Sequence, residues 1–292
     1  MVQALNTGCH ASDIIYANPC KGPRDIRVAA RLHVPRTVVD SPEEVEKLAA
    51  SGWKGSALIR LLVPDAGSAQ PFSKKFGAPL SWVPEILNSL RLFRIPHAGW
   101  SFHVGSMCQT PTQFSGAIEL CAAAHTFTPS LANPVVDVGG GFMAEEEVFA
   151  ASAAEIRRSF KTFPSSTEWI AEPGRFMAAP TACLEVPVIG VKRSLDGKGF
   201  RYTVDESLYS AFSNIPFDGQ RPTFELVDGL PRPLVKATLF GRTCDSADCL
   251  GEVEIPKLRV GDWLRIKDMG AYTMVSASEF NGFRDAGRQY LE

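Results

Sequence analysis

The sequence lacks the features that would place a protein in a membrane or outside the cell. No window approaches the roughly 18 consecutive apolar residues of a membrane-spanning helix. The start, MVQALNTGCHASD, has neither the basic region nor the apolar core of a signal peptide. The seven cysteines are scattered and never spaced as a CxxC pair, which gives a zinc or thioredoxin-like site little support. We therefore expect free thiols, no metal site, no membrane contact and a cytoplasmic protein.

An excess of positive charge is also missing. The 30 Lys and Arg residues face 32 Asp and Glu residues, for a formal net charge of -2, so nucleic acid is not an expected partner. Hydrophobic residues make up 45% of the 292 positions and charged residues 21%, as in ordinary globular proteins. This length suits one large domain or a large and a small one.

Residues 1–180 alternate short apolar runs with amphipathic stretches. Ser41-Pro42-Glu43-Glu44 is typical of a helix start, with Ser41 as the N-cap and Glu44 closing a capping box. Two more helices are expected within 111–127 and 145–163. The expected strands are 13–17, 36–39, 57–63, 98–103, 134–138 and 168–171. This alternation predicts an α/β domain of βα units, either a barrel or an open parallel sheet, because six strands fit both.

From about Cys183 the chain changes character. Runs of β-branched and aromatic residues between turn residues predict an antiparallel β domain over 181–292. The expected strands are 184–191, 200–204, 234–240 and 262–266, with a hairpin turn at 195–199.

Three motifs follow strands of the first domain at their carboxyl ends, which share one edge of a parallel sheet. Gly139-Gly140-Gly141 would let backbone amides approach a phosphate, or would form a tight structural turn. His103 could stack on a flat aromatic ligand while Ser106 donates to phosphate, or it could be a core histidine. Glu172 could pair with a protonated ring nitrogen and Arg175 with a phosphate, or the two could belong to a surface ion pair. Together the motifs favour a phosphorylated aromatic cofactor.

Two motifs lie in the second half. Cys244-Asp245 could meet a cationic substrate, or could be a buried thiol beside an acid in a turn. Tyr272 offers a phenol that could bind phosphate, or it could simply pack.

The set and order of these motifs resemble the ornithine/lysine/arginine decarboxylases, which depend on pyridoxal 5'-phosphate (PLP) and have an alanine-racemase-like fold. The resemblance covers nearly the whole chain. It rests on 13–21 (DIIYANPCK), 75–77 (KFG), 102–106 (FHVGS), 137–142 (DVGGGF), 172–175 (EPGR), 243–245 (TCD), 261–263 (GDW), 269–273 (MGAYT) and 280–283 (FNGF). It implies a PLP-binding (β/α)8 barrel with a β domain, which works as a head-to-tail homodimer on an amino-acid substrate.

The resemblance also implies roles for the cofactor-side residues. His103 would stack on the PLP ring, and Glu172 would keep the ring nitrogen protonated. The charged ring is then an electron sink for the carbanion left when carbon dioxide departs. The phosphate would be surrounded by Ser106, Gly139, Gly140, Gly141, Arg175 and Tyr272.

On the substrate side, the resemblance implies that a second subunit supplies Cys244 as the proton donor to the carbanion. Asp218 and Asp245 of that subunit would hold the distal amine of the substrate, and Phe280 would line the pocket. Two acids facing a terminal ammonium group would select a diamino acid.

The sequence departs from the family pattern in several places. The family's Schiff-base lysine lies upstream of the stretch that matches 13–21, and residues 1–12 contain no lysine, so we expect a barrel without its first strands. Pro71 stands where the family has arginine, and 143–144 read Met-Ala instead of Pro-Gly. Changes beside Asp205 and Asp218 (Val-Asp-Glu for Asn-Asp-Gly, Asp-Gly for Asp-His) predict an altered substrate pocket.

Three functional hypotheses follow. The first is a PLP-dependent decarboxylase of a basic amino acid, ornithine-like and diverged toward a specialised metabolite. The second is a catalytically deficient paralogue that acts by dimerisation or by binding regulators. The third is an enzyme that uses the old pocket without covalent attachment of the cofactor.

Overall fold

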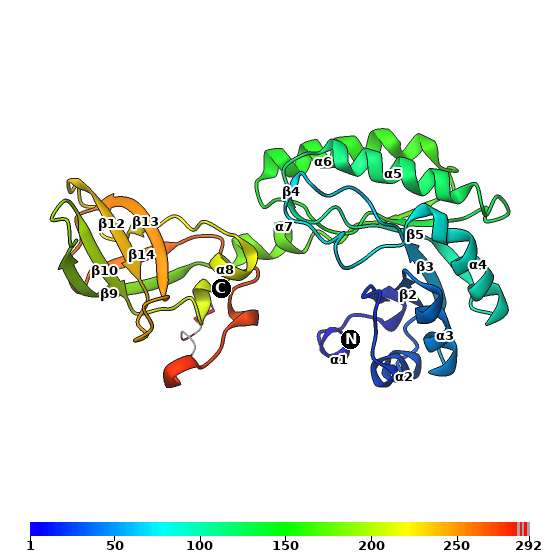
Figure 1. Cartoon of the computed structure of the whole chain (residues 1–292), viewed down its shortest axis with the longest axis horizontal. Helices are drawn as coiled ribbons and strands as arrows, with labels where there is room; N and C mark the ends of the chain where they lie inside the picture. Colours follow the sequence, from blue (N-terminus) through cyan, green and yellow to red (C-terminus); the bar gives the residue numbers. More distant parts are fainter. Residues whose placement is uncertain (285–286, 288, 291–292) are drawn as a thin grey trace. The chain divides into compact units, whose positions relative to one another are not determined.

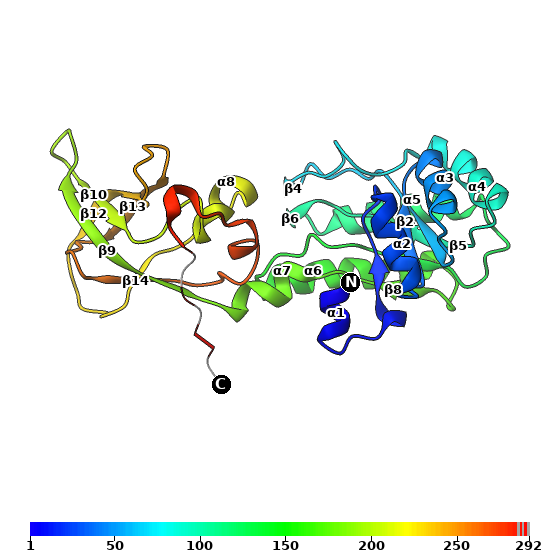
Figure 2. The same ribbon diagram turned by 90° about the horizontal axis from the view of Figure 1, so that it is seen from below.

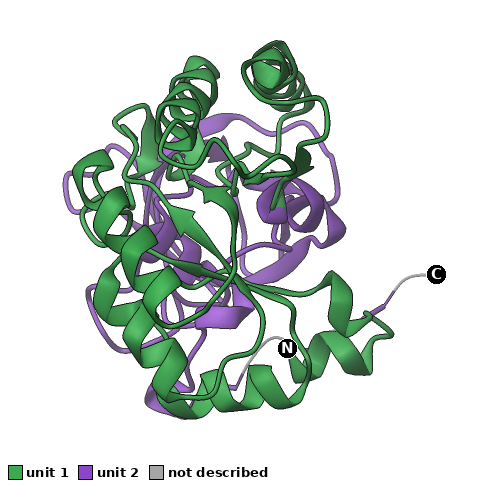
Figure 3. Ribbon diagram, turned by 90° about the vertical axis from the view of Figure 1, so that its right-hand side faces the viewer, with its two compact units in different colours: residues 1–173 green, residues 174–292 purple. Residues whose placement is uncertain are grey.

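The computed structural model describes residues 1–284, 287, 289 and 290. The chain forms two compact units, Met1–Pro173 and Gly174–Glu292 (Figure 3). The boundary lies a few residues before the one expected at 180/181, so Arg175 belongs to the second unit.

The first unit is built on a six-stranded parallel sheet. The strands are β1 (Ile15–Tyr16), β2 (Arg36–Val39), β3 (Ser56–Arg60), β5 (His97–Ser101), β7 (Val135–Asp137) and β8 (Glu168–Ile170). All neighbours run parallel, and they follow one another in chain order. A doubly wound sheet reverses its order at a switch point, whereas a β/α barrel progresses in one direction. The order therefore confirms the barrel-type sheet.

Helices cover the outer face of this curved sheet (Figure 1). They are α2 (Pro23–Arg31), α3 (Pro42–Ala50), α4 (Val83–Leu92), α5 (Thr112–His125) and α6 (Glu146–Ser159), with a short α1 (Val2–Asn6) at the start. The predicted start of α3 is confirmed, because the Ser41 hydroxyl accepts a hydrogen bond from the Glu44 amide at 3.2 Å. Helices α2 and α4 and the ribbon of β4 (Ser68–Gln70) and β6 (Ser106–Cys108) were not anticipated (Figure 2).

The second unit is a six-stranded sheet in the order β11-β14-β9-β10-β12-β13. Its strands are β9 (Leu184–Arg193), β10 (Phe200–Val204), β11 (Glu225–Leu226), β12 (Leu234–Phe240), β13 (Cys249–Pro256) and β14 (Trp263–Ile266), and its helices are α7 (Gly174–Ala178) and α8 (Asn214–Asp218). The predicted hairpin joins β9 to β10, where the Ser194 amide donates to the Gly199 carbonyl at 2.9 Å.

The prediction of an antiparallel sheet needs one correction. β10 and β12 run parallel, while the other four neighbouring pairs are antiparallel. Two neighbouring strands can run parallel only if the chain between them crosses from one end of the strands to the other. The segment between β10 and β12, which contains α8 and β11, makes this crossing. The core of this unit includes the fully buried side chains of Tyr202 and Phe212.

No helix in the described part of the chain is long and apolar enough to cross a bilayer. All seven cysteines lie in that part, and all are free thiols.

Candidate functional site

Three loops at the carboxyl ends of β5, β7 and β8 meet in the first unit. They carry His103, the glycines 139–141 and Glu172. The Glu172 amide donates to the Gly139 carbonyl at 2.8 Å. A Cβ atom at Gly140 would lie 2.9 Å from His103 Nε2 and 2.9 Å from the Glu172 carbonyl oxygen. The structure thus brings together the three motifs that the sequence places at this edge.

His103 presents a neutral, flat ring. Its Nδ1 accepts a hydrogen bond from the Gly105 amide at 3.0 Å, so the ring proton is on Nε2. Burial, and then the positive charge of Arg60, lower the pKa of His103 to about 4. The Phe72 ring packs against the imidazole at 4.8 Å. An uncharged imidazole at neutral pH is suited to stack on an aromatic ligand.

The glycine loop is shaped by a close approach of two backbones. Gly139 has a φ of 63° and Gly141 a φ of 100°. A Cβ at Gly139 would lie 2.2 Å from the Phe102 carbonyl oxygen, and one at Gly141 would lie 2.3 Å from the Gly105 carbonyl oxygen. Both positions therefore require glycine. This close approach explains the glycines by itself, and their contact with a phosphate stays a prediction, as does that of the buried Ser106.

A buried acid that sequence reasoning missed lies beside Glu172. Asp137 ends β7 with no exposed surface, and its Oδ1 accepts from the Gly139 amide at 2.9 Å. Its Oδ2 has no hydrogen-bond donor among the described residues. Burial, and then the negative charge of Glu172, raise the pKa of Asp137 to about 8. The sequence signal was the acid at the end of an apolar strand, directly before the glycines.

Arg60, at the end of β3, is the cation of this cluster. Its guanidinium lies over the Phe76 ring at 5.0 Å. Burial lowers its pKa, opposed by the negative charges of Asp40 and then Glu172. The cluster thus offers a neutral imidazole and, on a loop of the same edge, the exposed carboxylate of Glu172, together with the partly buried cation of Arg60.

In the second unit, Arg175, Asp218 and Tyr272 form one group. Arg175 Nη1 and Nη2 donate to Asp218 Oδ2 and Oδ1 at 2.7 and 2.8 Å, and both side chains are buried. The guanidinium lies 4.7 Å from the centre of the Tyr272 ring, which is half exposed. The predicted role of Asp218 at the substrate amine is untested, since its observed partner is Arg175.

Cys244, Asp245 and Phe280 form a second group in the same unit. The exposed Cys244 thiol donates to Asn281 Oδ1 at 3.4 Å. Asp245 accepts from the Tyr209 hydroxyl at 2.5 Å, and the Tyr209 ring stacks on Phe280 at 4.1 Å. Hydrogen bonds from Tyr209 and then from the Ala247 amide lower the pKa of Asp245, which is therefore charged at neutral pH.

A buried carboxylate supports this loop. Asp248 accepts from the Ser207 hydroxyl, the Leu208 amide and both the amide and the hydroxyl of Thr243, at 2.7 to 3.1 Å. It fixes the backbone directly before Cys244. Sequence reasoning missed Asp248 and Tyr209, because Ser207 and Leu208, which donate to Asp248, and Asp245, which accepts from Tyr209, are 36 to 41 residues away from them.

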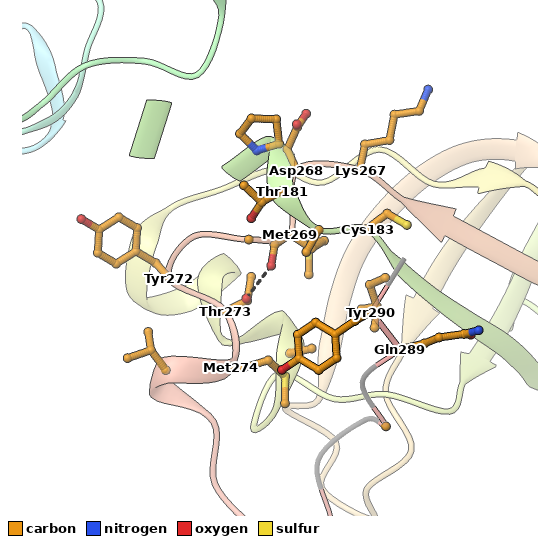
Figure 4. Close-up of a pocket in the computed structure, with 17 residues that line it drawn as sticks. Thr181, Cys183, Lys267, Asp268, Met269, Tyr272, Thr273, Met274, Gln289 and Tyr290 are labelled. Carbon is orange, nitrogen blue, oxygen red and sulfur yellow. Dashed lines mark hydrogen bonds between the residues drawn. The ribbon is translucent and has the colours of Figure 1, made fainter. Parts of the chain in front are cut away.

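A cavity of about 740 Å³ lies within the second unit. Its wall includes Thr181, Cys183, Met269, Tyr272 and Tyr290, and the Thr273 hydroxyl there donates to the Met269 carbonyl at 2.7 Å (Figure 4). Of the predicted cofactor residues, only Tyr272 is part of this wall. No three His, Cys, Asp or Glu side chains of the described residues are grouped to hold a metal ion.

Each unit, taken by itself, has residues that suit part of a phosphorylated pyridine. The first unit offers the flat neutral ring of His103 after β5 and the carboxylate of Glu172 after β8, with β7 between these strands, and the second unit offers a guanidinium and a phenol. Fold and residues together define a PLP-binding barrel protein with a β domain.

Comparisons with known proteins agree. Residues 1–179 match the family model of the pyridoxal-dependent decarboxylases, pyridoxal binding domain. The chain is 34% identical to a probable ornithine decarboxylase of Dictyostelium discoideum over 96% of this chain and 64% of that protein. It is 34% identical to ornithine decarboxylase of Caenorhabditis elegans, over 98% of this chain and 73% of that protein. It is 32% identical to antizyme inhibitor 2 of Xenopus laevis, over 98% of this chain and 67% of that protein. The chain thus spans about two thirds of the length of these relatives.

Solved structures show the same fold. Arginine decarboxylase of Paramecium bursaria Chlorella virus, bound to agmatine, superimposes with a TM-score of 0.91 at 30% identity, over 97% of this chain and 79% of that one. Lysine/ornithine decarboxylase of Vibrio vulnificus, complexed with cadaverine, gives a TM-score of 0.86 at 30% identity (97% and 76%). The chain belongs to the ornithine/arginine family of pyridoxal-dependent decarboxylases, whose cofactor is PLP.

Proposed function

We propose that this protein is a PLP-dependent decarboxylase of a basic amino acid, ornithine-like in its substrate. The observation that carries the proposal is the loop with the exposed Cys244 thiol beside the charged Asp245, fixed by the buried Asp248. A protein under no catalytic constraint has little reason to keep both groups on one supported loop.

On the cofactor side, His103 would stack on the ring through its neutral imidazole, and Glu172 would keep the ring nitrogen protonated. By the family resemblance, Ser106, the glycine loop, Arg175 and Tyr272 would hold the phosphate. When bound, PLP supplies an electron sink for the electrons released as carbon dioxide leaves.

On the substrate side, Asp245 binds the distal ammonium group. Its lowered pKa keeps it negative throughout the neutral range, so attraction to a cation is available there. Cys244 donates a proton to the α-carbon, and Phe280 lines the pocket with the Tyr209 ring stacked on it.

We further propose a cytoplasmic homodimer that acts in polyamine biosynthesis, with Cys244 and Asp245 serving the active site of the other subunit. The free state of all seven cysteines supports a reducing compartment. The support for the dimer is the family resemblance.

A second candidate is a catalytically deficient paralogue that acts by dimerisation. The observation that favours it is the state of Lys21, the first lysine in the sequence. Its amine donates to the carbonyls of Asn18, Pro19 and Val38 and pairs with Glu44 at 3.0 Å, so it is committed to structural contacts. The similarity to antizyme inhibitor 2 is in line with this candidate.

The deciding experiment is release of carbon dioxide from ornithine, lysine and arginine by protein supplied with PLP. We expect Cys244→Ala to lower kcat about 100-fold or more, since general acids contribute about 10²–10⁴. Asp245→Asn should raise KM about tenfold or more, because a hydrogen bond to a charged group is worth about 1.5–3 kcal/mol. The matched control is Cys183→Ala, which removes another exposed thiol of the same unit and should change neither constant. No release from any of the three would leave the paralogue as the better account.

A further inference from the structure

Arg242, two residues before Cys244, contacts a segment far along the chain. Its Nη2 donates to the Arg284 carbonyl at 2.7 Å, 42 positions away. The guanidinium also lies 4.8 Å from the centre of the Phe283 ring. The Arg242 side chain is only 11% exposed. One buried cation therefore contacts both the backbone and an aromatic ring of the segment 278–284.

The 278–284 segment also supplies the neighbours of the Cys244 thiol. The thiol donates to Asn281 Oδ1 at 3.4 Å. Phe280 stacks on the Tyr209 ring at 4.1 Å, and the Ser278 amide donates to the Tyr209 carbonyl at 2.8 Å. Tyr209 and Cys244 therefore hold the start and the middle of the segment, and Arg242 holds its end.

Two acids that follow β10 hold Arg242 in turn. Arg242 Nη1 lies 3.5 Å from Asp205 Oδ1, and Nη2 lies 3.8 Å from Glu206 Oε1. The Arg242 amide donates to the Glu206 carbonyl at 3.0 Å, and Glu206 is 1% exposed. Glu206 stands where the family resemblance has glycine. This departure from the family pattern therefore supplies a buried acid beside Arg242.

We propose that Arg242 is a positioning residue for the proton donor Cys244, and that it acts by fixing the 278–284 segment against the loop that carries the thiol. A planar guanidinium can donate to a carbonyl and lie on an aromatic ring at the same time. With the end of the segment fixed, Asn281 keeps its place at the thiol and Phe280 keeps its place on Tyr209. The role of Cys244 as proton donor rests on the proposed function.

The test uses the full chain and needs no cofactor. It measures the rate at which iodoacetamide alkylates each cysteine, resolved by mass spectrometry, and the hydrogen exchange of the 278–284 amides. Arg242→Met should raise the alkylation rate of Cys244 about fivefold, the factor expected for the loss of one ordinary hydrogen bond, and should speed exchange in the segment. Cys183, another exposed thiol of the same unit, should change less than twofold.

A second variant acts from the other side of the contact. Phe283→Leu removes the ring under Arg242 at a partly exposed position, so it decides the matter if Arg242→Met does not fold. It should raise the alkylation rate of Cys244 about threefold. The double variant should match Arg242→Met, because both changes break one contact. The matched control is Arg193→Met, an exposed arginine at the end of β9, which should change neither measurement.

Three results would overturn the proposal. One is an unchanged Cys244 rate in both the Arg242 and the Phe283 variants. Another is an equal rise at Cys244 and Cys183, which would show general loosening of the unit. The third is a double variant whose effect is the product of the two single effects. If wild type releases carbon dioxide, Arg242→Met should lower kcat about fivefold and leave KM within twofold. A wild type without turnover would count against the proposed function, while the alkylation rates would still decide the role of Arg242.

Discussion

Replacing Asp137 by asparagine should stabilise the protein at alkaline pH and have little effect at acid pH. The carboxyl is fully buried against Glu172, and burial followed by that negative charge raises its pKa to about 8 from 3.8. Asparagine keeps the acceptor for the Gly139 amide and offers N–H groups toward Glu172 with no proton to lose.

The sign follows from proton binding. Between about pH 4 and pH 8 the folded chain keeps a proton on Asp137 that the unfolded chain has released, so the free energy of unfolding falls as pH rises through this window. Each tenfold change in proton affinity is worth about 1.4 kcal/mol, so the free energy of unfolding can fall by at most on the order of 5 kcal/mol across this window. Glu172 is exposed and Arg60 lies nearby, so we expect about 2 kcal/mol after solvent screening.

The assay is urea unfolding, followed by tryptophan fluorescence at pH 4.5 and pH 8.5, for wild type and Asp137→Asn. The variant should gain about 2 kcal/mol at the higher pH and almost nothing at the lower. The matched control is Asp65→Asn. Burial raises the Asp65 pKa, but hydrogen bonds from Ser73 and Phe72 outweigh it and lower the pKa below 3.8, so the contribution of this carboxylate is present at both pH values and the control should lose a similar amount of stability at each. A gain for Asp137→Asn that is equal at both pH values, or a loss at pH 8.5, would refute the reasoning.

Further predictions concern stability, measured by chemical denaturation. Asp248→Ala should cost about 3 kcal/mol, because four donors lose a buried charged acceptor, and it should slow any turnover that uses Cys244. Gly139→Ala should cost about 2 kcal/mol or more, since its Cβ would meet a carbonyl at 2.2 Å, whereas Gly116→Ala, in the open middle of α5, should gain about 0.5–1 kcal/mol. Lys21→Met should cost about 3 kcal/mol, because the buried Glu44 loses its buried cation and keeps the partly exposed Lys47 and the backbone amide of residue 21, so a neutral result would show that burial of the pair contributes nothing.

Much of the barrel unit could be predicted from local signals. All six strands of its sheet were expected, because each is an apolar run that ends at a polar or glycine-rich loop. The choice between barrel and open sheet was not available from these runs. It depends on which strands pair, and the pairing is set by contacts between residues far apart in the chain.

Only those residues of the site that belong to a local sequence motif could be predicted. His103, the glycine loop and Glu172 were expected at one edge because parallel strands put their carboxyl ends there. Asp137 and Asp248 were missed, because the raised pKa of Asp137 comes from burial and from Glu172 on another strand, and Asp248 accepts from Ser207 and Leu208, 41 and 40 positions away. The pairing of Asp218 with Arg175 joins residues 43 positions apart and has no periodic signal in the sequence.

The most direct test of the account is the absorbance spectrum of the purified protein titrated with PLP, before and after borohydride. The account predicts a saturable cofactor band, and fixation by borohydride to a residue that mass spectrometry locates would show that a lysine other than the family's Schiff-base lysine attaches the cofactor. It also predicts weaker binding in Glu172→Gln, because that variant removes the carboxylate expected at the ring nitrogen. No band, or a band lost entirely on dialysis, would contradict the decarboxylase proposal.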